Sequence, residues 1–279
     1  MTKTVICLLL WLPGVAFAQR PAAHPYSWLA ADHYDARQTL ASRFVPPAGA
    51  ARVPVAAGSF GFWLRYLPLR PAGAAVHLYN GQLKKPQTVH AAVVRIDVGR
   101  RDLQQCADAV IRLRAEYLFG QNPDKVHFHL TSGHDIWFSD WYAGKGFRVQ
   151  GEDVVAAPKA VEQPTYAVFR RYLDQIFTYA GTRSVAREMQ PVAMAMLQPG
   201  DVFVQGGAPG HAVLVLDVSV NPRTGRRYFL LAQSYMPAQE IHVLRNLQDA
   251  KLSPWYALEE RAPLETPEWD FTTDQLRRF

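Results

Sequence analysis

The sequence predicts an α+β fold in which helices come first and an antiparallel sheet follows. Two observations support this prediction. Before Pro199, two stretches of the chain carry apolar residues with helical periodicity. After Pro199, short β-branched runs follow one another, separated by Gly, Pro and Asn residues. Helices and strands that occupy different parts of a chain are typical of the α+β class.

The first part of the chain contains two predicted strands and two predicted helices. The run from Val89 to Val98 alternates and is β-branched, which indicates a strand. Asp102 is a good N-cap for a helix that runs to about Phe119. We expect a short alternating strand at residues 126–130 and a second helix at residues 166–179.

The second part contains four predicted strands and a hairpin. The strands cover residues 202–205, 212–220, 228–235 and 240–244. The loop from Asn221 to Gly225 fits a hairpin connection. Centring this loop near Arg223 pairs residues whose numbers sum to about 446, so His211 and Gln233 become diagonal neighbours on one face.

The N-terminus has the three parts of a secretory signal: a lysine, an apolar stretch and a small-residue cleavage pattern, AFA. We therefore expect a signal peptide at residues 1–18 and a periplasmic or secreted protein. Residues 19–57 are rich in Ala and Pro and are interpreted as an extended arm with one short helix around residues 28–40. Residues 58–279 contain no linker-like stretch and suit a single domain.

Charge and hydropathy argue against two kinds of partner. Without the signal, whose single charge is Lys3, the formal net charge falls from +6 to +5. The positive charges are spread out and form no basic run of the kind that binds nucleic acid. No second apolar stretch approaches the roughly 18 residues that cross a bilayer. We expect no nucleic acid and no transmembrane segment, and cell-wall peptide or glycan remains as a partner.

Cysteine usage singles out one residue. Cys7 lies in the expected signal, so Cys106 is the lone cysteine of the mature chain. In an oxidising compartment such a thiol is either buried or kept for its chemistry. A helix N-terminus favours a thiolate, but with Asp102 as the cap Cys106 lies late in the first turn, in line with Leu103 and Val110. A catalytic nucleophile and a small core residue both stay open.

His211 opens an otherwise aliphatic strand, directly after the glycine-rich loop QGGAPG. A histidine that serves as base for a thiol needs its second ring nitrogen held by a polar partner, and Gln233 is placed to hold it. Gly206, Gly207 and Gly210 would keep bulk away from the imidazole and leave it open to a cleft. The alternative is that His211 simply ends a strand at the surface.

Five segments carry a resemblance to a known family: LYNGQLK, RDLQQCADAVIRLRAEYL, GDVFVQGGAPGHAVLVLDV, LLAQSYMPAQEIH and LSPWY. With these segments, most of the chain from Phe60 onward resembles the bacterial domain of unknown function family 4846. This resemblance implies a secreted bacterial protein and brings no activity with it.

The order of the motifs has a more remote likeness. A helix with a cysteine, a strand after GD, a strand after GH and a strand with a polar residue follow one another. This order is similar to that of the NlpC-type papain-like cysteine hydrolases, which are cell-wall amidases and endopeptidases. The resemblance implies a papain-like helix packed on an antiparallel sheet, with Cys106, His211 and Gln233 in the catalytic places. The chain lacks an Asp-Cys-Ser-Gly signature, and its 105 positions from Cys106 to His211 require a large insertion.

The segment KVHFHLTSGHDIWFSDWYAG, residues 125–144, is a second candidate site. On a strand His127 and His129 project from one face, and His134 and Asp135 follow in a loop, so a zinc-like ligand set can be drawn from these four residues. Their spacing matches no metal signature, and a solvated histidine face is the alternative. We expect no metal and no cofactor.

Aromatic residues follow in the same segment, in a predicted loop. Trp137, Phe138, Trp141 and Tyr142 are dense enough to stack on sugar rings, and Trp137, Trp141 and Tyr142 are the candidate substrate-binding residues. The alternative is that these rings cover an exposed end of the sheet.

Two functions from different classes stay open. The first is a secreted cysteine hydrolase, amidase or peptidase-like, that acts on an amide of cell-envelope peptide, with Cys106 as nucleophile, His211 as base and Gln233 as the orienting group. The second is a non-catalytic envelope protein that binds a glycan or peptide through its cleft and aromatic loop. A metal-dependent enzyme centred on His127 and His129 is a weaker third.

Overall fold

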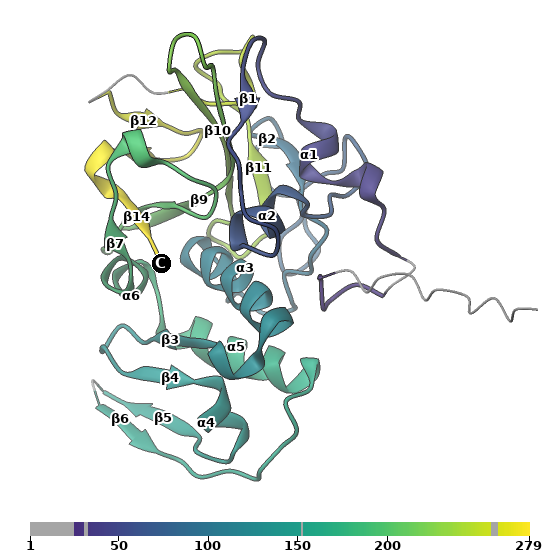
Figure 1. The fold of residues 1–279 in the computed structure, drawn as a ribbon. Helices are drawn as coiled ribbons and strands as arrows, with labels where there is room; N and C mark the ends of the chain where they lie inside the picture. Colours follow the sequence, from purple (N-terminus) through teal and green to yellow (C-terminus); the bar gives the residue numbers. More distant parts are fainter. Residues whose placement is uncertain (1–24, 31–32, 152, 258–261) are drawn as a thin grey trace, which may run out of the picture.

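The computed structural model describes residues 25–30, 33–151, 153–257 and 262–279. It has a mixed α+β fold with one main antiparallel sheet and several helices (Figure 1). The expected signal peptide, residues 1–18, lies outside the described residues. No helix in the described part of the chain is long and apolar enough to cross a membrane.

The main sheet has the strand order β2-β11-β10-β9-β8-β14-β7, and β1 pairs with β9 beside this path. Its members are β1 (Ala51–Arg52), β2 (His90–Val93), β7 (Gln190–Pro191), β8 (Val202–Gln205), β9 (His211–Val220), β10 (Arg227–Gln233), β11 (His242–Leu244) and β14 (Leu276–Arg278). Because β1 and β14 belong to this sheet, it contains strands from both ends of the domain.

Three short antiparallel pairs and six helices complete the described elements. The pairs are β3 (His127–His129) with β4 (Asp135–Trp137), β5 (Phe147–Gln150) with β6 (Asp153–Ala156), and β12 (Leu264–Glu265) with β13 (Asp270–Phe271). The helices are α1 (Leu40–Arg43), α2 (Phe60–Arg65), α3 (Cys106–Gln121), α4 (Phe138–Tyr142), α5 (Tyr166–Tyr179) and α6 (Thr182–Glu188). Single 3-10 turns, η2 (Ala36–Gln38), η3 (Pro123–Lys125), η4 (Met194–Met196) and η5 (Thr273–Gln275), connect them.

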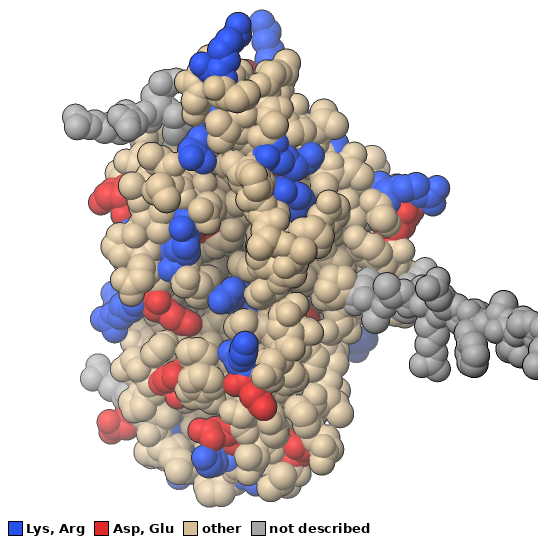
Figure 2. Space-filling model, in the orientation of Figure 1, with Lys and Arg blue, Asp and Glu red and all other residues tan. Residues whose placement is uncertain are grey.

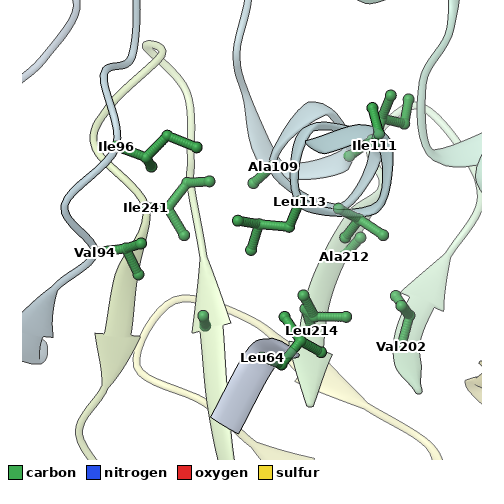
Figure 3. Packing of buried hydrophobic residues seen from close by; sticks show 14 of the residues in the cluster. Leu64, Val94, Ile96, Ala109, Ile111, Leu113, Val202, Ala212, Leu214 and Ile241 are labelled. Atoms are coloured by element: carbon green, nitrogen blue, oxygen red, sulfur yellow. The ribbon is translucent and has the colours of Figure 1, made fainter. Parts of the chain in front are cut away.

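Helix α3 lies between the main sheet and the layer formed by β3 to β6, α4 and α5 (Figure 1). Its Ala109 and Leu113 belong to one buried cluster with Leu214 of β9 and with Ile241, and Figure 3 shows these side chains gathered between helix and sheet. The opposite face of the sheet is buried by a second cluster that includes Phe271 of β13. Both faces of the sheet are therefore covered, which explains why its strands are almost continuously apolar.

Most predicted elements are confirmed within a residue or two, but the strand predicted at residues 89–98 ends at Val93. The helix at 166–179 and the strand at 202–205 have the predicted bounds. The hairpin pairs Ala232 with Leu214, which is the predicted register, and a bulge between Leu230 and Leu231 shifts the pairs nearer the turn by one residue. The register guess was therefore right at the end of the hairpin that carries His211.

Two predictions about helix starts were wrong. The Asp102 carboxylate does not cap α3, because it accepts a hydrogen bond from the Ala238 backbone N–H at 2.6 Å instead. The helix begins at Cys106 with Gln105 as its N-cap. In the arm, the helix expected around residues 28–40 is replaced in the described residues by η2 and α1, because a Thr39 capping box starts the α-helical turns at Leu40.

Candidate functional site

Cys106 is the first residue of α3, not a residue late in its first turn. The Gln105 backbone N–H donates to the Asp108 carboxylate at 3.0 Å, which closes the start of the helix around the cysteine. Cys106 as a residue is half-buried. At this position the free backbone N–H groups and the helix dipole favour a negative charge on sulfur.

The end of the β9–β10 hairpin opens beside this thiol. The pairing of the two strands ends at Leu214 and Ala232, and the Ala212 backbone N–H forms a hydrogen bond to the Cys106 thiol instead. Cys106 therefore lies next to the residue that follows His211.

A serine at the end of β10 links the hairpin to the helix start. The Ser234 Oγ lies 2.8 Å from the carbonyl oxygens of both Gln104 and Gln239, and it is fully buried. Since Gln104 lies two residues before Cys106, this hydrogen bond connects the strand that carries Gln233 to the start of α3.

His211 and Gln233 meet as the sequence predicted. The His211 Nε2 lies 2.8 Å from the Gln233 Oε1, and both residues are 1% exposed. His211 points to the sheet face opposite α3, where the rings of Tyr235, Trp269 and Phe271 pack around it with centroids 5.0, 5.5 and 5.9 Å away. The imidazole is therefore a buried group at the end of the sheet.

The expectation that glycines leave this imidazole open to a cleft was wrong. A Cβ atom at Gly210 would lie 2.5 Å from the Thr182 Oγ1, and one at Gly206 would lie 3.1 Å from the Ala186 Cβ. The glycines are thus needed because the loop passes against α6. The side of the imidazole is closed by aromatic rings instead.

Tyr235 is the side chain that the thiol and the imidazole share. The Tyr235 ring packs edge-on against His211, and the charge of Cys106 acts on the pKa of the same tyrosine. Within the described residues no hydrogen bond joins the Cys106 sulfur to the imidazole, whose Nε2 is held by Gln233.

Burial moves the pKa values of the two groups in opposite directions. Burial, with the nearby Asp108 carboxylate, raises the pKa of the Cys106 thiol to about 11, although hydrogen bonds from the Ala107, Ala212 and Cys106 backbones lower it. Burial lowers the pKa of His211 to about 4, while the hydrogen bond to Gln233 raises it. Both groups are therefore neutral at pH 7, and a reaction at sulfur would need proton transfer rather than a preformed ion pair.

Three polar residues that the sequence reasoning missed surround Gln233. Its Nε2 donates to the Glu268 Oε2 at 2.5 Å and lies 3.5 Å from the His242 Nε2. The Lys84 Nζ lies 2.5 Å from the other oxygen of Glu268. His242 could have been found, because β11 pairs it with Gln233. Lys84 ends the segment LYNGQLK and Glu268 lies in a loop outside the quoted segments, and neither carries a local signal that joins it to Gln233.

The candidate substrate-binding aromatics lie elsewhere. Trp141 is 6% exposed, and its Nε1 donates to the Gln175 Oε1 at 2.7 Å, so it is part of the core. Trp137 is 38% exposed and stacks on His127 at 4.0 Å. Instead of the predicted loop, Trp137 ends β4, and Trp141 and Tyr142 lie in the short helix α4.

The structure does not bring these aromatics to Cys106. The Tyr142 hydroxyl donates to the Asp124 Oδ1 at 2.5 Å, and Asp124 belongs to η3, directly after the C-terminal end of α3. Cys106 is at the other end of that helix. Sixteen helical residues span about 24 Å at about 1.5 Å each, so α4 and the thiol lie at opposite ends.

The histidines of the same segment are each paired separately. The His127 Nδ1 lies 2.9 Å from the Asp135 Oδ1, the His129 Nδ1 lies 3.6 Å from the Glu188 Oε2, and the His134 Nδ1 lies 3.1 Å from the Ser132 Oγ. Among the residues that the structure describes, no group of three or more His, Cys, Asp or Glu side chains could hold a metal ion.

The fold and the site define a class: an α+β protein with a cysteine at a helix start and a buried His–Gln pair at the end of its main sheet. The chain matches the family model of the Domain of unknown function (4846), DUF4846, over residues 40–278. Because this match covers most of the chain, the protein belongs to the DUF4846 family. No curated protein and no solved structure matches the chain.

Proposed function

We propose that this protein is a secreted cysteine hydrolase that cleaves an amide bond in cell-envelope peptide, with a papain-like arrangement of the NlpC type. The observation that supports the proposal most is the 2.8 Å hydrogen bond of the His211 Nε2 with Gln233, at the residue next to Ala212, whose backbone acts on the Cys106 thiol. Nucleophile, base and orienting group are the parts that thiol catalysis needs. The expected signal peptide puts the enzyme in the compartment of its substrate.

In the proposed mechanism the two neutral groups react together. As the Cys106 sulfur attacks the substrate carbonyl carbon, the His211 Nδ1 takes the thiol proton. His211 then gives that proton to the leaving amine as the C–N bond breaks, which leaves a thioester on Cys106. Water, deprotonated by the His211 Nδ1, then attacks the thioester carbonyl. The C–S bond breaks, the carboxylic acid product is released, and the Cys106 sulfur takes the proton back from His211 to give the free thiol. Gln233 stabilises the imidazolium that forms in both steps.

Backbone N–H groups are placed to stabilise the negative charge that develops in these steps. The amides of Cys106, Ala107 and Ala212 already act on the sulfur. The first amides of a helix have no partner within the helix and point out of its N-terminus. The same groups are suited to stabilise the oxyanion of the tetrahedral intermediate.

The second candidate function is a non-catalytic envelope protein that binds a peptide or glycan. Its support is the combination of a thiol pKa of about 11, an imidazole pKa of about 4 and a fully packed His211 side chain. These features are also those expected of a His211–Gln233 pair that stabilises the fold and takes no part in a reaction. The exposed Trp137 would then provide a ring for stacking on a sugar.

Alkylation of the lone cysteine separates the two functions. The mature chain contains one thiol, so iodoacetamide reports on Cys106 alone. An unassisted thiol with a pKa of about 11 is ionised to about one part in ten thousand at pH 7, and its alkylation rate rises about tenfold per pH unit. If the protein is a hydrolase, we expect the alkylation rate at pH 7 to lie well above the rate of such an unassisted thiol. We expect His211→Ala to lower that rate about 100-fold or more.

Two controls complete this experiment. His127→Ala changes a histidine at the far end of α3 and should leave the alkylation rate unchanged. Circular dichroism of each variant confirms that it is folded. The hydrolase function would be contradicted, and the binding protein favoured, if the wild-type alkylation rate equals that of an unassisted thiol and does not change in His211→Ala.

A further inference from the structure

We propose that Glu268, held in place by Lys84, is a positioning residue that fixes the ring tautomer of His211 through Gln233. This inference deepens the proposed function and rests on it for its catalytic meaning, but its geometry stands on its own. Lys84 ends the segment LYNGQLK, but no sequence motif joins it to Glu268, which lies 184 positions away.

The first step is the direction of the Glu268 carboxylate. Lys84 is 3% exposed, and its Nζ lies 2.5 Å from the Glu268 Oε1. A buried ammonium donor stabilises a carboxylate, and a carboxylate has oxygens that only accept hydrogen bonds. The second oxygen, Oε2, is left to face Gln233 as an acceptor.

The second step is the orientation of the Gln233 amide. The amide atom 2.5 Å from the Glu268 Oε2 must be the NH2 group, because two oxygens would repel each other. His242 requires the same orientation. Its Nδ1 lies 2.8 Å from the Glu240 carbonyl oxygen and must donate, so in the neutral ring Nε2 is an acceptor that also faces the NH2 group.

The third step fixes the imidazole. With its NH2 group turned toward Glu268 and His242, Gln233 presents its Oε1 to His211. A carbonyl oxygen only accepts, so the His211 Nε2 must carry the proton. The Nδ1 then carries the lone pair, which is the form that a base for the Cys106 thiol needs. Three interactions therefore determine one proton position.

Glu268 belongs to the β12–β13 hairpin, which also packs against the imidazole of His211. It lies in the turn between β12 and β13, and the next residues of this hairpin, Trp269 and Phe271, place their rings against His211. The C-terminal segment thus provides both the cover and the polar contact of the site.

The direct test is the tautomer itself. In ¹⁵N-histidine-labelled mature protein at pH 7, long-range ¹H–¹⁵N correlation spectra distinguish the Nε2–H from the Nδ1–H form of each ring. We expect His211 as Nε2–H and His242 as Nδ1–H, with His211→Gln and His242→Gln used for assignment. An Nδ1–H tautomer at His211 in the wild-type protein would overturn the inference, whatever the variants do.

The variant Glu268→Gln tests the source of that preference. Lys84 needs an acceptor, so the new amide turns its oxygen to Lys84 and its NH2 group to Gln233. Gln233 is then pushed to present its oxygen to residue 268 and its NH2 group to His211. We expect the Nε2–H form to lose its dominance, and Cys106 alkylation at pH 7 to slow by about tenfold or more.

Glu265→Gln is the matched control, because it makes the same charge change at an exposed position of the same hairpin and should alter neither readout. If Glu268→Gln keeps a dominant Nε2–H tautomer, Glu268 does not position the ring. If the tautomer responds as expected while Cys106 remains inert in every variant, the positioning role stands and the hydrolase function fails.

Discussion

Two regions of this protein combine histidines with aromatic rings, and they are built in opposite ways. At the end of the β9–β10 hairpin, Gln233 meets His242, His211 and Glu268, which lie 9, 22 and 35 positions away, and both histidines are buried. In the segment of residues 125–144, His127 pairs with Asp135 eight positions away across one small hairpin. The first arrangement exists only when the whole domain folds, whereas the second is local.

The surface of the second region agrees with this difference. In the lower part of Figure 2, acidic and basic side chains are interspersed, and the exposed pair of Lys145 with Asp140 belongs to this layer. Exposed ion pairs contribute roughly 0–1 kcal/mol each. Buried polar groups that lose a partner cost more. The buried polar groups that would be costly to leave unpaired, not the segment richest in motif residues, therefore indicate where a site is held in place.

The largest expected effect tests whether the aromatic residues are core or binding surface. Trp141→Ala removes a ring that is 6% exposed, its hydrogen bond to Gln175 and the contact of the Lys159 ammonium, 3.9 Å from the ring centroid. We expect the free energy of unfolding to fall by about 3–5 kcal/mol. Trp137→Ala, at the partly exposed ring, should cost less than about 1 kcal/mol.

Urea unfolding followed by circular dichroism measures both values. Equal costs for the two tryptophans would mean that α4 is not anchored in the core through Trp141. If instead Trp137→Ala alone abolishes binding of a glycan, the exposed ring is a binding surface that works without the thiol site.

The second effect is a loss of stability in acid that comes from the buried histidines. Burial, opposed by a hydrogen bond to Glu240, lowers the pKa of His242 to about 3, and the nearby charges of Lys84, His90 and His211 lower it further. In the unfolded chain a histidine has a pKa of about 6.5. Between these two pKa values only the unfolded state binds the proton, so the stability present above pH 6.5 is lost as the pH falls.

For His242 this loss is about 2 kcal/mol between pH 7 and pH 5. The free energy of unfolding of wild-type protein and His242→Gln, measured in urea at both pH values, isolates the effect, because carboxylates contribute equally to both proteins. We expect the variant to lose about 2 kcal/mol less than the wild type on acidification. Equal losses would show that His242 takes up its proton in the folded state.

The secondary structure was largely predictable because it depends on local patterns. The apolar periodicity of residues 166–179 and the β-branched runs after Pro199 give helix α5 and strand β8 their bounds. The start of α3 was not predictable, because Asp102 has the chemistry of an N-cap but its carboxylate is used by the distant Ala238 N–H. A tertiary hydrogen bond overrode a local preference.

The candidate site was predictable where the hairpin register determines it. His211 and Gln233 are two residues of one hairpin, so counting from its turn was enough to place them together. The partners of that pair were not predictable, since Lys84 and Glu268 reach it from loops whose positions follow no periodicity. The burial of the His211 imidazole was not predictable either, because the rings that cover it belong to the C-terminal β12–β13 hairpin.

The smallest expected effect concerns the serine that links β10 to the start of α3. Ser234→Ala removes a buried hydroxyl with partners at Gln104 and Gln239, so we expect a loss of about 1–2 kcal/mol in the free energy of unfolding. Ser219 is a matched control, because its hydroxyl is buried in β9 with no hydrogen-bond partner among the described residues. Ser219→Ala should change stability by less than about 0.5 kcal/mol. If the two variants cost the same in urea unfolding, the Ser234 hydrogen bond does not hold the strand to the helix, and the cysteine must be positioned by the packing of α3 alone.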